Sequence, residues 1–190
     1  YFQIKRTSGT VNILKAANDG IHAGQYFQMN GGTLNINGTT AGDCVQAELT
    51  TDPEDEHNGE AIIKGGTLNI TVAAEDAKGI KADTDITISG GTFNILAEGN
   101  GSRGIQNDGN VVIGEEDNTT SITITAAGGK CTNPECEADP HNCMGMKTEG
   151  NLTVNAGYVK VNKTGKKAKA IKVGGTYTIN GGTVDAEVVH

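Results

Sequence analysis

A short segment recurs along the whole chain, and this repeat limits the possible folds more than any other feature of the sequence. Residues 80–95 read IKADTDITISGGTFNI, and residues 21–36 match them with the same internal spacing. Further copies open at Val45, Ile105, Met146 and Ile171, and residues 1–13 match the back half of a copy. A chain built from successive similar units folds by stacking them, so the repeat predicts a solenoid.

Each copy contains three short runs of β type. Ile80–Ala82, Ile86–Ile88 and Phe93–Ile95 alternate apolar and polar residues, as a strand with one buried face does. One copy cannot bury its inner face alone, whereas stacked copies form three parallel sheets around a shared aliphatic core. The sequence therefore predicts an all-β fold, a right-handed parallel β-helix of about six to seven coils. A β-propeller is less favoured because its repeats approach about 40 residues.

The domain organisation follows from the same repeat. It leaves no linker between the first and last coils, so residues 1–190 are expected to form one β-helix domain. The first copy is incomplete, so we expect this chain to be a piece of a longer precursor. A polar insertion that contains cysteines interrupts the repeat at about residues 128–143.

Charge excludes some classes of partner. The formal net charge of −8 argues against nucleic acid, whose phosphates require a basic face. No apolar run is long enough to span a membrane. The last two coils are nevertheless rich in lysine, which would suit an anion or, alternatively, a solvated end that resists edge pairing. These residues are Lys160, Lys163, Lys166, Lys167, Lys169 and Lys172.

The cysteines admit two interpretations. Cys131, Cys136 and Cys143 lie in the insertion, which cannot fold on a core of its own, and Cys44 lies in an early coil. Disulfides formed in an oxidising compartment would staple the insertion, although the sequence does not determine the pairing. Alternatively, Cys131, Cys136, His141 and Cys143 would bind zinc, with a spacing that departs from the usual knuckle.

Two ladders of acidic residues are expected, because equivalent positions of successive coils stack. The first follows the first strand of each copy, with Asp85, Asn107 and Asn110 beside it, and the second precedes that strand. Stacked carboxylates repel one another by about 1 kcal/mol even in water, so we expect Ca²⁺ to neutralise them. The alternative is that they are turn residues facing water. The expected metal ligands are Asp19, Asp43, Glu48, Glu75, Asp76, Asp83, Asp85 and Asp108.

The outward face of the first strand lies between the two ladders and is polar. We expect it to bind the ligand through His22, Gln46, Lys81, Gln106, Lys147 and Lys172. Lys81 is flanked by Asp76, Asp83 and Asp85, so the lysine and calcium together could hold a uronate. The alternative is a lysine paired with its acidic neighbours. The outward asparagines of the third strand are expected to form a structural ladder.

The motif GI-x-AD followed by ITI-x-GGT-x-NI, at residues 79–95, resembles a family of secreted bacterial carbohydrate-binding proteins that are calcium-bearing right-handed β-helices. That family is similar in structure to family 9 pectate lyases, and its members bind acidic pectic polysaccharide. The paired acids before the motif are only partly kept here, because Asp43 precedes Cys44 and Asp76 is separated from Gly79. In the lyases a lysine abstracts a proton acidified by calcium, and Lys81 is the nearest match.

Three functions are compatible with these observations. The first is extracellular or cell-surface binding of an acidic plant cell-wall glycan such as pectin or polygalacturonate, dependent on calcium and without catalysis. The low aromatic content of 4% argues against stacking on neutral crystalline glucan and favours this anionic ligand. The second is a calcium-dependent pectate lyase with Lys81 as its base. The third is a structural or adhesive stalk.

Overall fold

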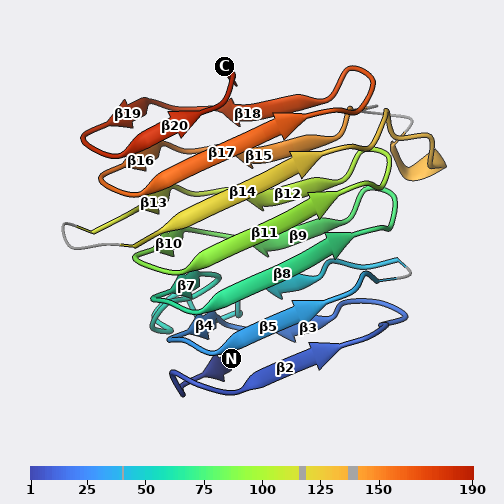
Figure 1. The fold of residues 1–190 in the computed structure, drawn as a ribbon. Helices are drawn as coiled ribbons and strands as arrows, with labels where there is room; N and C mark the ends of the chain where they lie inside the picture. The colour runs from blue at the N-terminus through green and yellow to red at the C-terminus, as the bar shows by residue number, and fades with distance from the viewer. Residues whose placement is uncertain (40, 116–118, 137–140) are drawn as a thin grey trace.

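The computed structural model describes residues 1–39, 41–115, 119–136 and 141–190, and it shows a parallel β-helix (Figure 1). Three parallel sheets, each of seven strands, run the length of the molecule. Every neighbouring strand in a sheet comes from the next coil, so the chain winds through the three sheets in turn, about seven times. The predicted right-handed solenoid is confirmed. Among the described residues, no helix has the length and apolar character needed to cross a membrane.

We name the sheets by their order within the repeat. The first sheet contains β3 (Ile21–Ala23), β6 (Val45–Ala47), β9 (Lys78–Ala82), β12 (Arg103–Asn107), β15 (Met144–Thr148), β18 (Lys169–Val173) and β21 (Val188–Val189). The second sheet contains β1 (Phe2–Ile4), β4 (Phe27–Met29), β7 (Ala61–Ile63), β10 (Ile86–Ile88), β13 (Val111–Ile113), β16 (Leu152–Val154) and β19 (Tyr177–Ile179). The third sheet contains β2 (Thr10–Ile13), β5 (Thr33–Ile36), β8 (Thr67–Val72), β11 (Thr92–Ala97), β14 (Ser121–Ala126), β17 (Tyr158–Lys163) and β20 (Thr183–Asp185).

The core is a stack of aliphatic side chains aligned in register. In the first sheet Ile80 pairs with Ile105, and in the second sheet Ile88 pairs with Ile113; all four are fully buried. Thr87, between Ile86 and Ile88, is exposed. This alternation is what the period of a half-buried strand requires. Each coil therefore contributes to one continuous core that no coil could form alone.

The turn between the second and third sheets depends on stacked glycines. Gly66 and Gly91 have φ values of +98° and +107°, in the left-handed region that favours glycine. A Cβ added to Gly66 would lie 2.6 Å from the carbonyl oxygen of Gly32, one coil below, and one added to Gly91 would lie 2.8 Å from that of Gly66. At the second position of these Gly-Gly pairs, glycine is therefore favoured for two reasons: the backbone is left-handed, and the neighbouring coil lies too close for a side chain.

Several strands are longer than the expected three residues. β11 extends to Ala97 because the ladder continues from Ile95 through Leu96, opposite Thr71 of β8. The first-sheet strands β9, β12, β15 and β18 also begin two residues earlier than expected, at Lys78 in β9. This earlier start brings basic residues into the outward surface of the first sheet.

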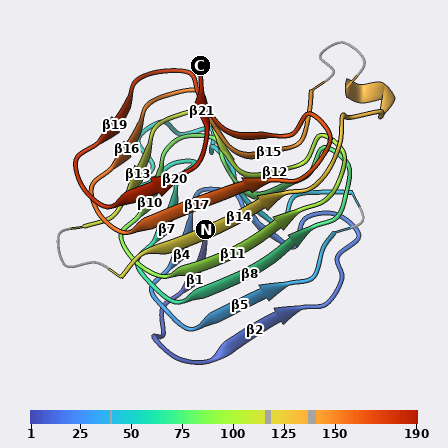
Figure 2. The ribbon, with the colours of Figure 1, turned by 45° about the horizontal axis from the view of Figure 1, so that its top comes forward.

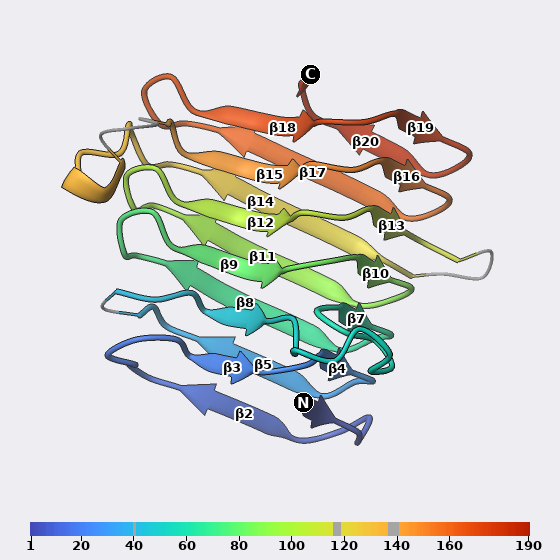
Figure 3. The same ribbon diagram turned by 180° about the vertical axis from the view of Figure 1, so that it is seen from behind.

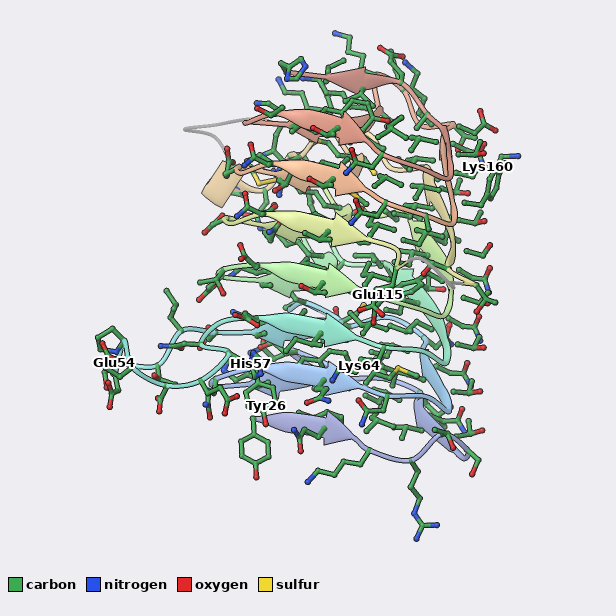
Figure 4. All side chains as sticks on the ribbon, turned by 90° about the vertical axis from the view of Figure 1, so that its left-hand side faces the viewer. Tyr26, Glu54, His57, Lys64, Glu115 and Lys160 are labelled. Atoms are coloured by element: carbon green, nitrogen blue, oxygen red, sulfur yellow. A yellow bond between two sulfur atoms is a disulfide. The ribbon has the colours of Figure 1, made fainter. Side chains whose placement is uncertain are left out.

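Two loops leave the solenoid. One joins β6 to β7, and Glu54 projects from the body on it while His57 lies beside Tyr26 (Figure 4). The other is the predicted insertion between β14 and β15, which carries the 3₁₀ helix η1 (Pro134–Cys136) at one corner (Figure 2). An antiparallel bridge between Lys130 and Asn142 closes the base of that insertion. Both loops therefore project from corners of the solenoid.

Candidate functional site

The outward face of the first sheet carries one continuous column of polar side chains. Its members lie opposite one another on successive strands, as predicted: His22, Gln46, Lys81, Gln106, Lys147 and Lys172. Figure 3 shows the strands of this sheet stacked in order along the molecule. We call this set the central column.

An acidic column follows the central column on the same face. Glu48, Asp83, Asp108 and Glu149 each stand two residues after a member of the central column. Because side chains at i and i+2 of a strand share a face, most of these acids meet the preceding polar residue. Gln46 Nε2 donates to Glu48 at 2.6 Å, Lys81 Nζ lies 3.6 Å from Asp83, and Lys147 Nζ lies 2.5 Å from Glu149.

Two of these contacts are ion pairs, and they neutralise Asp83 and Glu149 of the first acidic ladder. The hydrogen bond from Lys147 holds the pKa of Glu149 below its ordinary value. For Lys81 the structure shows the alternative that the sequence left open, a lysine paired with an acidic neighbour. Lys172 differs, because Gly174 stands where an acid would follow it, and no carboxylate of the described residues lies within 4 Å of its Nζ.

The second acidic ladder is not one column, which corrects the sequence interpretation. Val45 lies opposite Ile80, so Asp43 aligns with Lys78 and not with Asp76. Lys78 in turn pairs with Arg103. The column therefore changes from acidic at Asp19 and Asp43 to basic at Lys78 and Arg103, and it continues through Met144 to Lys169.

Asp19 and Asp43 tie successive coils together. Asp19 Oδ1 accepts the backbone N–H of Asp43 at 2.8 Å, and Asp43 Oδ1 accepts the N–H of Lys78 at 2.7 Å. Burial raises the pKa of Asp43, partly offset by the charge of Lys78. Each of these carboxylates makes its backbone contact through Oδ1, so its Oδ2 is not used in joining the coils.

Asp85 and Asn107 lie away from the first acidic column. Asp85 Oδ1 accepts the backbone N–H of Asn110 at 2.6 Å, and Asn110 Oδ1 accepts the N–H of Asn151 at 3.0 Å. These side chains form a turn ladder before the second sheet. Asn107 points inward, is fully buried, and donates to the carbonyl oxygens of Thr84 and Asn110.

Glu75 and Asp76 anchor the insertion. Glu75 accepts hydrogen bonds from the backbone N–H and hydroxyl of Thr132 and from the N–H of Asn133. Asp76 Oδ1 lies 2.8 Å from His141 Nε2, 3.2 Å from Arg103 Nη1 and 3.4 Å from Lys78 Nζ. Burial opposes ionisation of Asp76, but the charge of Lys78, the hydrogen bond with His141 and the charge of Arg103 hold its pKa below the ordinary value. Sequence reasoning missed Arg103 and His141 as partners because they are distant in sequence, and it missed Lys78, which stands only two residues after Asp76.

A hollow of about 650 Å³ brings several predicted residues together at the β3, β6 and β9 end of the face. Five of the expected metal ligands line it: Asp19, Asp43, Glu48, Glu75 and Asp76. The other three, Asp83, Asp85 and Asp108, do not. The hollow is also lined by His22, Gln46, Lys78 and Asn133. The stacking of coils thus collects carboxylates that are up to 57 positions apart.

His22 bridges two of these carboxylates. Its Nδ1 lies 2.8 Å from Asp19 Oδ2 and its Nε2 lies 3.1 Å from Glu48 Oε2. The hydrogen bond to Asp19 raises the pKa of His22. The oxygen donors of the hollow suit a hard cation such as Ca²⁺, provided that His22 gives up these two partners.

The cysteines separate into a surface pair and two core residues. Cys131 and Cys136 form a disulfide, which confirms one interpretation of the insertion. Cys143 is buried, and its Sγ lies 3.4 Å from the carbonyl oxygen of Ala97, so the zinc set that included it was wrong about Cys143. Burial raises the pKa of Cys44 to about 12 and also raises that of Cys143, so neither thiol is activated.

The outward face of the third sheet forms the expected asparagine ladder. Asn35, Asn69 and Asn94 each donate a side-chain hydrogen bond to the asparagine one coil below, at 2.8–2.9 Å. Lys160 continues this row beyond Thr123, so the predicted lysine cluster is divided between two faces. Figure 4 shows Lys160 at the edge of the molecule.

Comparison with known proteins gives one match. The model of a family described as carbohydrate-binding domain-containing protein matches residues 3–189. No curated protein and no solved structure shows a significant match.

Proposed function

Because the chain belongs to the family of carbohydrate-binding domain-containing proteins, we propose that it binds an acidic polysaccharide along the outward face of the first sheet, without catalysis. The observation that carries this proposal is the central column. It runs in register from the acidic hollow at β3 and β6 to Lys172 at β18. A row of hydrogen-bonding side chains every 4.7–4.9 Å or so suits an extended polymer better than a compact ligand.

The basic end of the face provides the charge that a uronate requires. Lys169 and Lys172 lie on β18, and Lys147 precedes them on β15. Lys172 lacks the acidic neighbour at i+2 that engages Lys81 and Lys147. An ammonium group with no carboxylate of the described residues within 4 Å is available to bind a carboxylate of the polymer by a charge-assisted hydrogen bond.

At the acidic end, we propose that Ca²⁺ joins the protein to the polymer. Asp19, Asp43 and Glu48 would hold the cation, with the polymer's carboxylates completing an oxygen coordination shell. A cation there would also relieve the cost of the buried Asp43 charge. Plant cell-wall pectin, whose uronates are carboxylates, is the polysaccharide class that we propose.

The contact of Lys81 favours binding over lysis. A lyase would require the amine as a free proton acceptor near a calcium-bound uronate. The Lys81 amine instead lies 3.6 Å from Asp83 on its own strand. We further propose that the protein acts outside the cell or at its surface, and the Cys131–Cys136 disulfide supports this location because disulfides persist in oxidising compartments.

Binding of polygalacturonate, with and without a calcium chelator, tests the proposal. Replacing Lys172 with Ala should weaken binding, whereas Lys160→Ala removes the same charge from the third sheet and should leave it unchanged. Equal effects of the two substitutions would place the polysaccharide elsewhere. Release of unsaturated uronide products would show catalysis and overturn the non-catalytic part.

A further inference from the structure

Four side chains converge where the insertion meets the solenoid. The ligand atoms of Cys131, Cys136 and His141 all lie within 4.8 Å of one another, a grouping of His, Cys and carboxylate atoms that the described residues show nowhere else. His141 Nε2 lies 2.8 Å from Oδ1 of Asp76, which comes from the corner before β9. Asp76 is not one of the three grouped residues, but its contact with the histidine places a carboxylate at the edge of the group.

A glycine makes room for this convergence. Gly101 has a φ of +67°, and a Cβ added to it would lie 3.2 Å from both Cys131 Sγ and His141 Nε2. Any larger residue would push into the space between the sulfur and the imidazole. Cys131 and Cys136 are each only 4% exposed, so the space is also sheltered from water.

We propose that reduction of the Cys131–Cys136 disulfide converts this cluster into a zinc site with Cys131, Cys136 and His141 as ligands and with Asp76, drawn in from the edge of the group, as the fourth. Zinc bonds of about 2.0–2.1 Å to nitrogen or oxygen and 2.3 Å to sulfur place neighbouring tetrahedral ligands about 3.3 Å and 3.8 Å apart, respectively. The His141 and Asp76 atoms need to separate by only about 0.5 Å. The Cα atoms of the two cysteines are 6.2 Å apart, which leaves their freed sulfurs room to rotate toward a shared ion.

The chemistry of the conversion balances with a dithiol as the reductant. The disulfide takes two electrons and two protons and becomes two thiols, while the dithiol is oxidised to its own disulfide. Each thiol then loses its proton as the sulfur binds zinc, because the thiolate is the ligand.

Basic side chains beside the cluster offset part of its negative charge. With zinc bound, two thiolates and Asp76 would carry three negative charges against two positive charges on the ion. Lys78 Nζ and Arg103 Nη1 already lie 3.4 Å and 3.2 Å from Asp76 Oδ1. Glu75 holds the turn that follows Cys131 through its hydrogen bonds to Thr132.

The site gives the insertion a second means of staying closed. A segment with no core of its own needs a cross-link, and the disulfide provides it under oxidising conditions. Zinc would provide it under reducing conditions, using the same two sulfurs. The proposal does not depend on polysaccharide binding, so each can fail without the other.

Titration with Co²⁺ and then Zn²⁺ tests the site. Wild-type protein reduced with a dithiol, with the reductant removed, should bind one equivalent of Co²⁺ with thiolate-to-cobalt charge-transfer absorption, and Zn²⁺ should displace it. The oxidised protein should show no such band. Cys131→Ser and Cys136→Ser should abolish the band, and His141→Ala and Asp76→Asn should weaken binding about tenfold or more.

Cys143→Ser and Cys44→Ser are the matched controls, because both thiols are buried away from the cluster. Far-UV circular dichroism of each sample shows whether the solenoid is intact. Folded, reduced wild-type protein without a charge-transfer band would overturn the proposal. So would loss of the band in a folded Cys143→Ser variant, which would restore the set suggested by sequence spacing.

Discussion

The side chains of Lys147 and Glu149, two residues apart on β15, form an ion pair with a 2.5 Å separation on the outward face of the first sheet. The pairing of Lys81 with Asp83 repeats this arrangement two coils earlier. At β18 the pattern stops, since Gly174 follows Lys172 at the same spacing. The face therefore contains both neutralised lysines and a lysine without such a pair, and the difference is testable.

The first prediction compares lysines of the central column. Lys172→Ala should weaken polygalacturonate binding by about 1.5–3 kcal/mol, the range for a hydrogen bond to a charged group. Lys81→Ala should weaken it less, because Asp83 already engages that amine. Isothermal titration calorimetry on both folded variants measures the difference, and a larger effect at Lys81 would contradict the assignment.

The second prediction concerns Asp43. Burial raises its pKa, so the ionised carboxylate costs stability at neutral pH and this cost disappears as the pH falls through the raised value toward the unfolded value. In the absence of calcium, Asp43→Asn should therefore stabilise the protein by about 1 kcal/mol, since the amide oxygen can still accept the N–H of Lys78.

Asp43→Ala provides the matched control. It removes the same charge but leaves the Lys78 N–H without its acceptor, so it should not stabilise the protein. Thermal melts of both variants in chelator decide the matter. An Asn variant less stable than wild type would show that the buried charge is already compensated.

The third prediction concerns His22. Its raised pKa means that the protonated ring stabilises the fold fully below about pH 6.5, and that this contribution is lost as the pH rises through the folded pKa. The side chain is half exposed, so the effect on the free energy of unfolding should be below about 1 kcal/mol. The difference in melting temperature between wild type and His22→Gln, measured across pH 5–8 or so, should follow this course.

Calcium should compete with the proton on His22, because both require Asp19 and Glu48. Calcium affinity of the wild type should fall on acidification, and His22→Gln should show a weaker pH dependence. A hundredfold excess of calcium over its Kd would stabilise the wild type by about 2.7 kcal/mol. An unchanged melt after chelation at neutral pH would contradict a calcium site in the hollow.

The fourth prediction tests the register of the solenoid. Ile88→Asp should prevent folding, because the side chain is fully buried in the core and an unpaired buried charge costs several kcal/mol. Thr87→Asp should be tolerated, because Thr87 faces water. Soluble expression and circular dichroism distinguish the two outcomes, and equal tolerance of both would contradict the register.

The register could be predicted because one period of alternation decides it. Shifting any strand by one residue would turn Ile86 and Ile88 to water and bury Thr87, so the apolar pattern and the Gly-Gly turns determine the faces together. The central column followed from that register. The predicted stacking of His22 on Gln46 and of Gln106 on Lys147 is therefore confirmed.

Part of the acidic arrangement could have been read from the alignment of the copies. Asp43 stands two residues before Val45 and Lys78 stands two residues before Ile80, so Lys78 and not Asp76 aligns with Asp43. His141 reaches Asp76 across 65 residues, through an insertion that follows no repeat. Corner and insertion geometry depends on which coil lies above, so only the folded structure reveals these contacts.

The most direct test of the account is the charge dependence of polysaccharide binding. Affinity should be measured for polygalacturonate and for its methyl-esterified form, at fixed calcium and again in chelator. The account predicts clear binding of the free acid with calcium, weaker binding in chelator and poor binding of the ester, since esterification removes the carboxylates that Lys172 and calcium would hold. Equal binding of the acid and the ester would contradict it.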